Sequence, residues 1–226
     1  MTDLAGSRVL VVGASGGLGA PLARGLAAGG ARLTLAGRDQ SRLDAVGLDD
    51  AHVVVADLRH PSAATSLVGA ALERHGGLDG VVFAAGVVAF GGVGDLDDEV
   101  VDELLVVNYL APARLARAAL PHLPAGGFIV NLSAIVAEQQ VPNMGAYCAS
   151  KAALTAFDAV LRMEARRSKV RVIDARPPHT ETGLAGRPIA GAAPRMPQGL
   201  SPDAVAARIL RALTDDETDL PSSAFA

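Results

Sequence analysis

Residues 8–30 read RVLVVGASGGLGAPLARGLAAGG, and this stretch predicts the class of the fold. The apolar run of residues 8–12 suits a buried parallel strand, and residues 20–28 carry the apolar spacing of a helix that two glycines close. Between them stands the pattern G-x-x-x-G-x-G, formed by Gly13, Gly17 and Gly19. Glycine lets the backbone turn tightly there and lets a pyrophosphate approach the amino terminus of the helix. The stretch therefore predicts a dinucleotide-binding strand–turn–helix unit.

Strand and helix patterns alternate along the rest of the chain. Further strands are expected at residues 32–36, 52–56, 78–84, 128–132 and 170–175, with helices between them and a last helix at residues 201–213. This order predicts an α/β fold: a Rossmann-type, doubly wound parallel sheet in three α/β/α layers. Six strands are expected, or seven if the weak pattern LPSSAFA at residues 220–226 forms one. We expect a single domain over residues 1–226, with residues 177–200 as a substrate-covering loop and 214–226 as a fraying tail.

Composition narrows the class of protein. The 226 residues are 50% hydrophobic but only 3% aromatic, so the core must be aliphatic. The net charge is −4 and no basic block stands out, which argues against nucleic acid as a partner. A single cysteine, Cys148, excludes an internal disulfide and fits a reducing compartment. No apolar run reaches membrane-spanning length and no secretory leader is evident, so a cytoplasmic location is expected.

The segment NLSAIVAEQQVPNMGAYCASK, residues 131–151, predicts the chemistry. Tyr147 and Lys151 are four residues apart, so on a helix both lie on one face. A neighbouring ammonium favours the phenolate, so we expect Lys151 to lower the pKa of Tyr147 and fit it for proton transfer. Ser133 follows an apolar strand, and its hydroxyl is expected at the strand's carboxyl end, where such sheets place ligands. An ordinary surface helix with an unremarkable Tyr and Lys is the alternative.

The end of the second strand bears on the choice of cofactor. An acidic residue there would bind the ribose 2′-hydroxyl of NAD, whereas this chain has Gly37 and Arg38. A guanidinium suits the 2′-phosphate of NADP, so NADP(H) is the preferred cofactor, with NAD(H) possible. A solvated Arg38 beside Asp39 is the alternative.

Taken together, these patterns resemble the short-chain dehydrogenase/reductase family in its single-domain form, over roughly residues 8–213. The resemblance rests on the glycine turn and on Asp57, Ala84-Ala85-Gly86, Asn108, Ser133 and Tyr147-x-x-x-Lys151, in that order. It implies an NADP(H)-dependent oxidoreductase that interconverts a carbonyl and an alcohol. It also implies a homodimer or homotetramer, with no nucleic-acid or membrane partner.

The resemblance also implies the site residues. Tyr147 is expected as general acid or base, Lys151 as the residue that tunes it, Ser133 as the donor to the substrate carbonyl, and Asn108 as the residue that orders a water. The cofactor contacts implied are Gly13, Ser15, Gly16, Gly17, Leu18, Gly19, Arg38, Asp57, Leu58, Ala84, Ala85, Gly86, Tyr147, Lys151, Pro177, Thr180 and Thr182. No metal ligand is expected.

One departure from the family pattern and several alternatives stay open. Pro178 stands where the family usually has glycine, which puts the path of the following loop in doubt. His179 is either a substrate contact or a loop histidine without a role. The rival functions are a nucleotide-sensing regulator without turnover, an enoyl reductase, a sugar-nucleotide epimerase and a structural subunit. The tyrosine–lysine spacing opposes the enoyl reductase, the chain length opposes the epimerase, and the catalytic set opposes the sensor and the structural subunit.

Overall fold

Seven parallel strands form the one sheet in the computed structural model of the protein, which describes residues 3–225. The strands lie in the order β3-β2-β1-β4-β5-β6-β7. Their bounds are β1 Arg8–Val12, β2 Arg32–Gly37, β3 His52–Val55, β4 Gly80–Phe83, β5 Phe128–Leu132, β6 Arg171–Ala175 and β7 Asp219–Leu220. The predicted Rossmann-type parallel sheet is confirmed.

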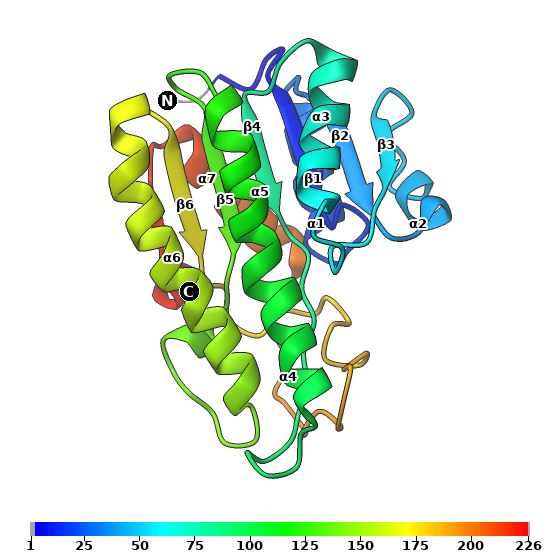
Figure 1. The fold of residues 1–226 in the computed structure, drawn as a ribbon, viewed down its shortest axis with the longest axis vertical. Helices are drawn as coiled ribbons and strands as arrows, with labels where there is room; N and C mark the ends of the chain where they lie inside the picture. Colours follow the sequence, from blue (N-terminus) through cyan, green and yellow to red (C-terminus); the bar gives the residue numbers. More distant parts are fainter. Residues whose placement is uncertain (1–2, 226) are drawn as a thin grey trace.

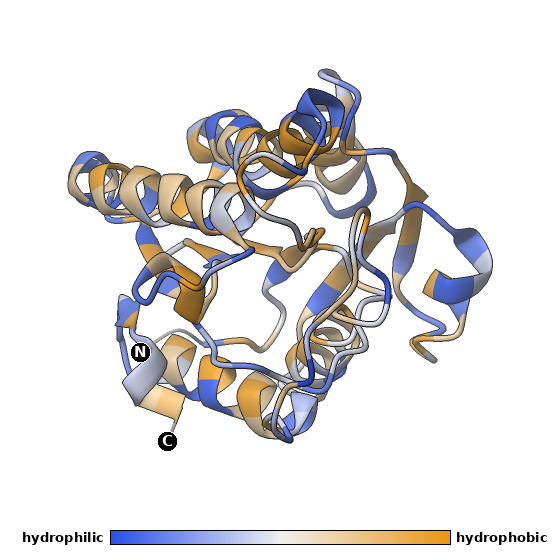
Figure 2. Ribbon diagram, turned by 90° about the horizontal axis from the view of Figure 1, so that it is seen from below, coloured by the Kyte–Doolittle hydropathy of each residue, from blue (hydrophilic) through white to orange (hydrophobic). Residues whose placement is uncertain are grey.

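Helices cover both faces of this sheet (Figures 1 and 2). Helices α1, α2 and α7 contribute to the core cluster on one face, and α3, α5 and α6 to the cluster on the other. The helix bounds are α1 Gly19–Ala28, α2 Gln40–Asp44, α3 Ala63–His75, α4 Asp98–Leu105, α5 Ala111–Ala119, α6 Gly145–Ala165 and α7 Pro202–Thr214. None of the helices within residues 3–225 is long and apolar enough to cross a membrane.

Strand β1 shows why the apolar runs become buried parallel strands. Val9 and Val11 pack into the cluster under α1 and α7, whereas Leu10 and Val12 pack into the cluster under α3, α5 and α6. A strand covered on both faces needs apolar residues at every position, and valine and leucine supply them without aromatic rings. The expected aliphatic core is therefore the one that forms.

The sheet reverses its winding between β1 and β4. The chain passes from β1 outward to β3, then returns to place β4 on the other side of β1. At this switch point the loops leave in opposite directions, and ligands of such folds bind at the carboxyl ends of the strands. The glycine turn leaves β1 at this point, and the Ala84-Ala85-Gly86 turn leaves β4 beside it.

The C-terminal residues differ from the expectation of a fraying tail. Strand β7 pairs with β6 through the registers Asp174 with Asp219 and Ala175 with Leu220. Leu220 is fully buried, and a short 3₁₀ turn, Ser222–Phe225, buries Phe225. A seventh strand therefore exists at Asp219–Leu220, whereas most of the weak strand candidate LPSSAFA forms the 3₁₀ turn, and its residue 226 lies outside the described residues. Fraying was the wrong expectation for residues 219–225.

A second difference lies between α4 and α5. The expected bend near Pro112 is a π turn, Val106–Leu110, one turn earlier. Proline has no N–H to donate to the carbonyl of residue 108, and the N–H of Ala111 bonds the carbonyl of Val106, five residues back. The irregular turn contains Asn108.

Candidate active site

A cavity of about 480 Å³ opens at the carboxyl ends of β1, β2, β4 and β5. It is bounded by the glycine turn on one side and by the start of α6 on the other. The expected site residues that line it are Gly13, Ser15, Gly16, Gly17, Leu18, Arg38, Asp57, Leu58, Ala84, Ala85, Gly86, Ser133, Tyr147, Lys151, Pro177, Thr180 and Thr182. Gly19 and Asn108 lie outside its lining. The structure thus brings the two halves of the expected site into one space.

The glycine turn is packed so closely that side chains have no room. Gly13 has φ +79°, and a Cβ on it would lie 2.5 Å from the backbone nitrogen of Ala85. A Cβ on Gly19 would lie 2.0 Å from the carbonyl oxygen of Gly13. No side chain caps the first turn of α1. Gly19 therefore shapes the turn from behind, and the open helix terminus beside the cavity fits the pyrophosphate of a dinucleotide.

Three arginines line the cavity where β2 and β3 end: Arg38, Arg42 and Arg59. Asp39 is occupied by capping α2, where its side chain accepts from the N–H of Arg42. Asp57 forms an ion pair with Arg59, whose hydrogen bonds lower the pKa of this carboxyl group to about 2. Sequence reasoning missed Arg42 and Arg59. The spacing R-x-x-x-R from Arg38 to Arg42 was the available signal.

Tyr147 and Lys151 lie in the first two turns of α6, and both are buried. Nζ of Lys151 donates to the carbonyl of Leu132 at 2.8 Å. Burial lowers the pKa of Lys151 to about 8, while the carboxylates of Asp174 and Asp158 oppose the shift. Burial also raises the pKa of Tyr147, with a further contribution from Cys148. The expected lowering of the Tyr147 pKa by Lys151 is therefore wrong for this arrangement, because loss of solvation dominates.

Ser133 lies at the end of β5, and its hydroxyl makes two hydrogen bonds. Its hydroxyl donates to the backbone carbonyl of Lys151 at 3.0 Å and accepts from Oγ1 of Thr155 at 2.9 Å. In this arrangement the O–H of Ser133 is donated to α6. The next residue, Ala134, lines the cavity without a hydroxyl. Sequence spacing placed Ser133 correctly at the strand end but could not give the direction of its O–H.

Asn108 fixes the π turn against the β4 loop. Its Oδ1 accepts from the N–H of Val87 at 3.0 Å, and its Nδ2 donates to the carbonyl of Val87 at 2.9 Å and to Oγ of Ser150 at 3.0 Å. Ser150 in turn donates to the carbonyl of Tyr147 at 2.8 Å. A Cβ on Gly86 would lie 3.3 Å from Oδ1 of Asn108 and 3.5 Å from Nζ of Lys151. Asn108 therefore stands beside Lys151 and ties three segments together.

The loop after β6 crosses the cavity. A Cβ on Gly17 would lie 2.5 Å from Cβ of Thr182, so this loop packs directly on the glycine turn. Farther along, Ala190 bridges to Ala89, and Thr180 bridges to Leu200. The loop adds Arg187 to the cavity lining, a cation that sequence reasoning did not single out.

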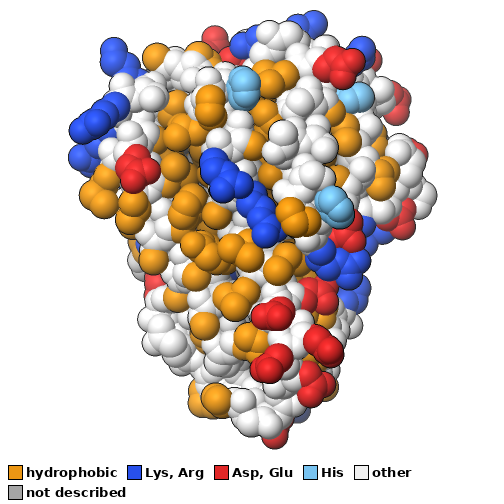
Figure 3. Space-filling model, viewed as in Figure 1, with side chains coloured by type: hydrophobic (Ala, Val, Ile, Leu, Met, Phe, Trp, Pro, Cys, Tyr) orange, Lys and Arg blue, Asp and Glu red, His pale blue; other side chains and the backbone are white. Residues whose placement is uncertain are grey.

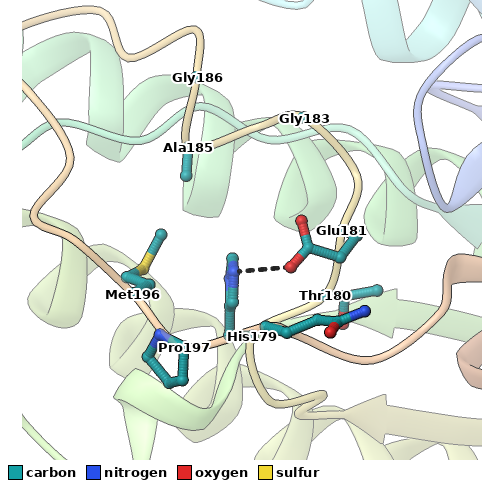
Figure 4. A pocket seen from close by; sticks show the side chains of 9 residues that line it. His179, Thr180, Glu181, Gly183, Ala185, Gly186, Met196 and Pro197 are labelled. Carbon is teal, nitrogen blue, oxygen red and sulfur yellow. Dashed lines mark ion pairs between the residues drawn. The ribbon is translucent and has the colours of Figure 1, made fainter.

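A second cavity of about 570 Å³ lies within the same loop (Figure 4). His179 and Met196 belong to the lining of both cavities. Nε2 of His179 lies 3.5 Å from Oε1 of Glu181, which also accepts from the N–H of Gly199. His179 thus stands where the two cavities adjoin, next to the mostly apolar wall formed by Val88, Phe90, Val136, Val141, Met144 and Leu184.

Comparison with known proteins shows which sequences and structures the chain is similar to. Residues 7–190 match the family model of the short chain dehydrogenases. An uncharacterised oxidoreductase of Methylorubrum extorquens is 33% identical, over 96% of this chain and 94% of that protein. Dehydrogenase/reductase SDR family member 7B of Danio rerio is 32% identical, over 94% of this chain and 75% of that protein. The crystal structure of a short chain dehydrogenase from Burkholderia cenocepacia J2315 in complex with NADP has a TM-score of 0.88 and 30% identity over the full length of both chains.

Proposed function

The chain belongs to the short-chain dehydrogenase/reductase family and is an NAD(P)-dependent oxidoreductase, and from this premise we propose that it interconverts a small-molecule carbonyl and its alcohol with NADP(H). The observation that carries the proposal is a single cavity lined by the glycine turn, four arginines, Tyr147 and Lys151. The nicotinamide ring of the bound dinucleotide supplies or accepts the hydride.

Tyr147 is the proposed proton donor. It is the phenol that lines the cavity, and a phenol, whose ordinary pKa is about 10, is protonated at neutral pH. A protonated phenol is the form that gives its proton to a carbonyl oxygen during reduction. Lys151, held by the carbonyl of Leu132, presents an ammonium for the ribose hydroxyls of the cofactor. Ser133 orients Lys151 through its backbone, and Asn108 holds the β4 loop against α6.

The preference for NADP(H) rests on positive charge at the end of β2. Arg38, Arg42 and Arg59 line this part of the cavity, and Asp57 is already paired with Arg59. Arg38 also attracts the carboxylate of Asp57, and its guanidinium lines the cavity where a phosphate would bind. A 2′-phosphate carries the negative charge that such a cluster favours. The apolar wall beside Tyr147 favours a hydrophobic or mixed substrate.

A sensor that binds NADP(H) without turnover is the second candidate, favoured by one observation. The O–H of Ser133 is donated to the backbone carbonyl of Lys151, and Ala134 carries no hydroxyl. Tyr147 is then the neighbouring hydroxyl that remains for a substrate carbonyl. A panel of carbonyls and alcohols, followed by NADPH absorbance, separates the two functions. Turnover of any member that is lost in Tyr147→Phe supports the enzyme. Tight NADPH binding with no turnover across the panel supports the sensor.

Arg38→Ala tests the cofactor preference. We expect the wild-type protein to bind NADPH about tenfold more tightly than NADH, since one charge-assisted contact contributes roughly that factor. The substitution should narrow this ratio by weakening NADPH alone, as measured by fluorescence titration. Arg24→Ala, an exposed position on α1, is the matched control. An unchanged ratio in Arg38→Ala would refute the role of Arg38.

A further inference from the structure

Two carboxylates are buried between α6 and the sheet, and the proposed chemistry does not use them. Asp158 on α6 is 0% exposed and Asp174 on β6 is 1% exposed. Asn131 on β5 is the direct register partner of Asp174, and its Nδ2 donates to Oδ1 of Asp158 at 2.6 Å. Paired residues of neighbouring strands point to the same face of a sheet. The two carboxylates and Asn131 therefore form one polar cluster under α6.

Each carboxylate has one oxygen that no donor reaches. Oδ2 of Asp158 and Oδ1 of Asp174 are shielded from solvent and accept no hydrogen bond from the described residues. Thr155 lies beside Asp174, and a hydrogen bond from its hydroxyl lowers the pKa of that carboxyl group, but the same single O–H also faces Oγ of Ser133 at 2.9 Å. An unpartnered, buried carboxylate oxygen is strongly unfavourable. Two of them in one cluster are best satisfied by one proton between the two groups.

The charges around the cluster also support one bound proton. The cations that face it are Lys151 and Arg162 from α6 and Arg176 from the end of β6. The other carboxylates are Asp219 from β7 and Glu138, which both contact Arg176, as Asp174 does. Three cations thus meet four carboxylates, and one bound proton makes the group neutral. Burial raises the pKa of both Asp158 and Asp174, and repulsion adds to each shift, from Asp174 on Asp158 and from Asp219 on Asp174.

The cluster touches the active site through α6. Thr155, one turn before Asp158, donates to Ser133, and Ser133 donates to the backbone carbonyl of Lys151. Both carboxyl groups act electrostatically on the ammonium of Lys151. A change in their charge therefore reaches the residue that lines the cavity.

We propose that Asp158 and Asp174 hold one proton between them and serve as a positioning pair that keeps a single negative charge behind Lys151. Asp174 keeps the charge, because Arg176 is its ion-pair partner, and Asp158 carries the proton and donates it towards Asp174. The link to Lys151 rests on the proposed function, whereas the shared proton does not.

Infrared spectroscopy tests the proton directly. At neutral pH in D₂O, the wild-type protein should show the C=O stretch of a protonated carboxylic acid, and Asp158→Asn should lose it. Glu164→Gln, an exposed position on the same helix, should keep the band. Absence of the band in the wild-type protein, or its survival in Asp158→Asn, would overturn the proposal. Neither outcome depends on dinucleotide binding.

The pH dependence of the melting temperature is the second readout. The unfolded chain releases the Asp158 proton above about pH 4, whereas the folded protein retains it. Rising pH therefore removes stability from the wild-type protein that Asp158→Asn does not lose. The melting temperature of Asp158→Asn, measured relative to that of the wild-type protein, should rise between pH 5 and pH 8. A difference that does not vary with pH contradicts a retained proton.

NADPH affinity against pH tests the link to Lys151. Asp158→Asn keeps the single charge and should leave this profile unchanged. Asp158→Asn combined with Asp174→Asn removes the charge, so the alkaline loss of affinity should move about one pH unit lower. A folded double variant, checked by circular dichroism, with an unmoved profile would overturn the positioning role. Failure of the wild-type protein to bind NADPH would instead refute the proposed function and leave the first two readouts standing.

Discussion

Tyr147 carries the sharpest prediction at the scale of single residues. Tyr147→Phe removes the phenol that lines the cavity while leaving the ring that packs beside Val88 and Val136. We expect turnover of any carbonyl that the wild-type protein reduces to fall by about a hundredfold or more, since proton transfer contributes that much. NADPH affinity should change less than about threefold, because the ring stays in place. Steady-state rates and a fluorescence titration measure the two effects, and undiminished turnover would contradict the role.

The sequence predicts which residues lie at the site better than it predicts the hydrogen bonds that these residues make. Tyr147, Lys151 and Ser133 were expected together because helical spacing and strand ends are regular. The direction of the Ser133 O–H depends on Thr155 and on a backbone carbonyl of α6, which only tertiary packing brings near. The pKa of Tyr147 depends on burial, which spacing along a helix does not reveal.

A substitution at Arg187 can distinguish a contact with the pyrophosphate of the cofactor from a contact with its 2′-phosphate. It lines the cavity with the glycine turn, and its Nε donates to the carbonyl of Gly183, next to the Thr182 that packs on Gly17. We expect Arg187→Gln to weaken NADPH and NADH alike by about fivefold, since both carry the pyrophosphate and the contact is exposed to solvent.

Arg195→Gln is the matched control for this variant, because Arg195 lies on the same loop, is exposed and does not line the cavity. Its affinities for NADPH and NADH should equal those of the wild-type protein. Selective weakening of NADPH in Arg187→Gln would place the arginine at the 2′-phosphate instead of the pyrophosphate.

At the scale of elements, the π turn between α4 and α5 depends on Asn108. This side chain is fully buried, and three hydrogen bonds join it to Val87 and Ser150. Asn108→Ala would leave the N–H and C=O of Val87 without these partners, so we expect a loss of about 2–3 kcal/mol in the free energy of unfolding. Urea denaturation measures it. Asp102→Ala on the exposed face of α4 should change stability little, and an equal loss there would show that the effect is not specific to the π turn.

The elements that sequence reasoning missed are those with little local signal. The longer strands can be recognised in the sequence as apolar runs, because both of their faces are buried. Strand β7 has two residues, and its place at the sheet edge is held by ion pairs from Arg176 and Arg162 to Asp219. The π turn arises from the missing N–H of Pro112 together with the buried Asn108. Both depend on contacts distant in sequence, which no short pattern contains.

For the whole molecule, the order of the strands decides where the chemistry can occur. The switch point between β1 and β4 opens one end of the sheet, and the loop after β6 crosses that opening from Thr182 on the glycine turn to Ala190 beside Ala89. Cofactor contacts, the proton donor and the apolar wall therefore come from distant parts of the chain. The fold brings them together, and the loop covers the cavity that they line.

The face formed by α5 and α6 carries the last prediction, a homodimer. Apolar side chains surround a short stripe of Lys or Arg side chains in the middle of this face (Figure 3), and on α6 Val160 is 48% and Met163 is 59% exposed. A second copy related by a twofold axis would bring the same apolar face against itself and remove it from water on both copies. Light scattering after gel filtration should give the mass of a dimer for the wild-type protein and of a monomer for Val160→Asp/Met163→Asp. Val93→Asp, in a loop where this side chain is 96% exposed, should leave the dimer intact. A monomeric wild-type protein, or a double variant of unchanged mass, would exclude this face as the subunit interface.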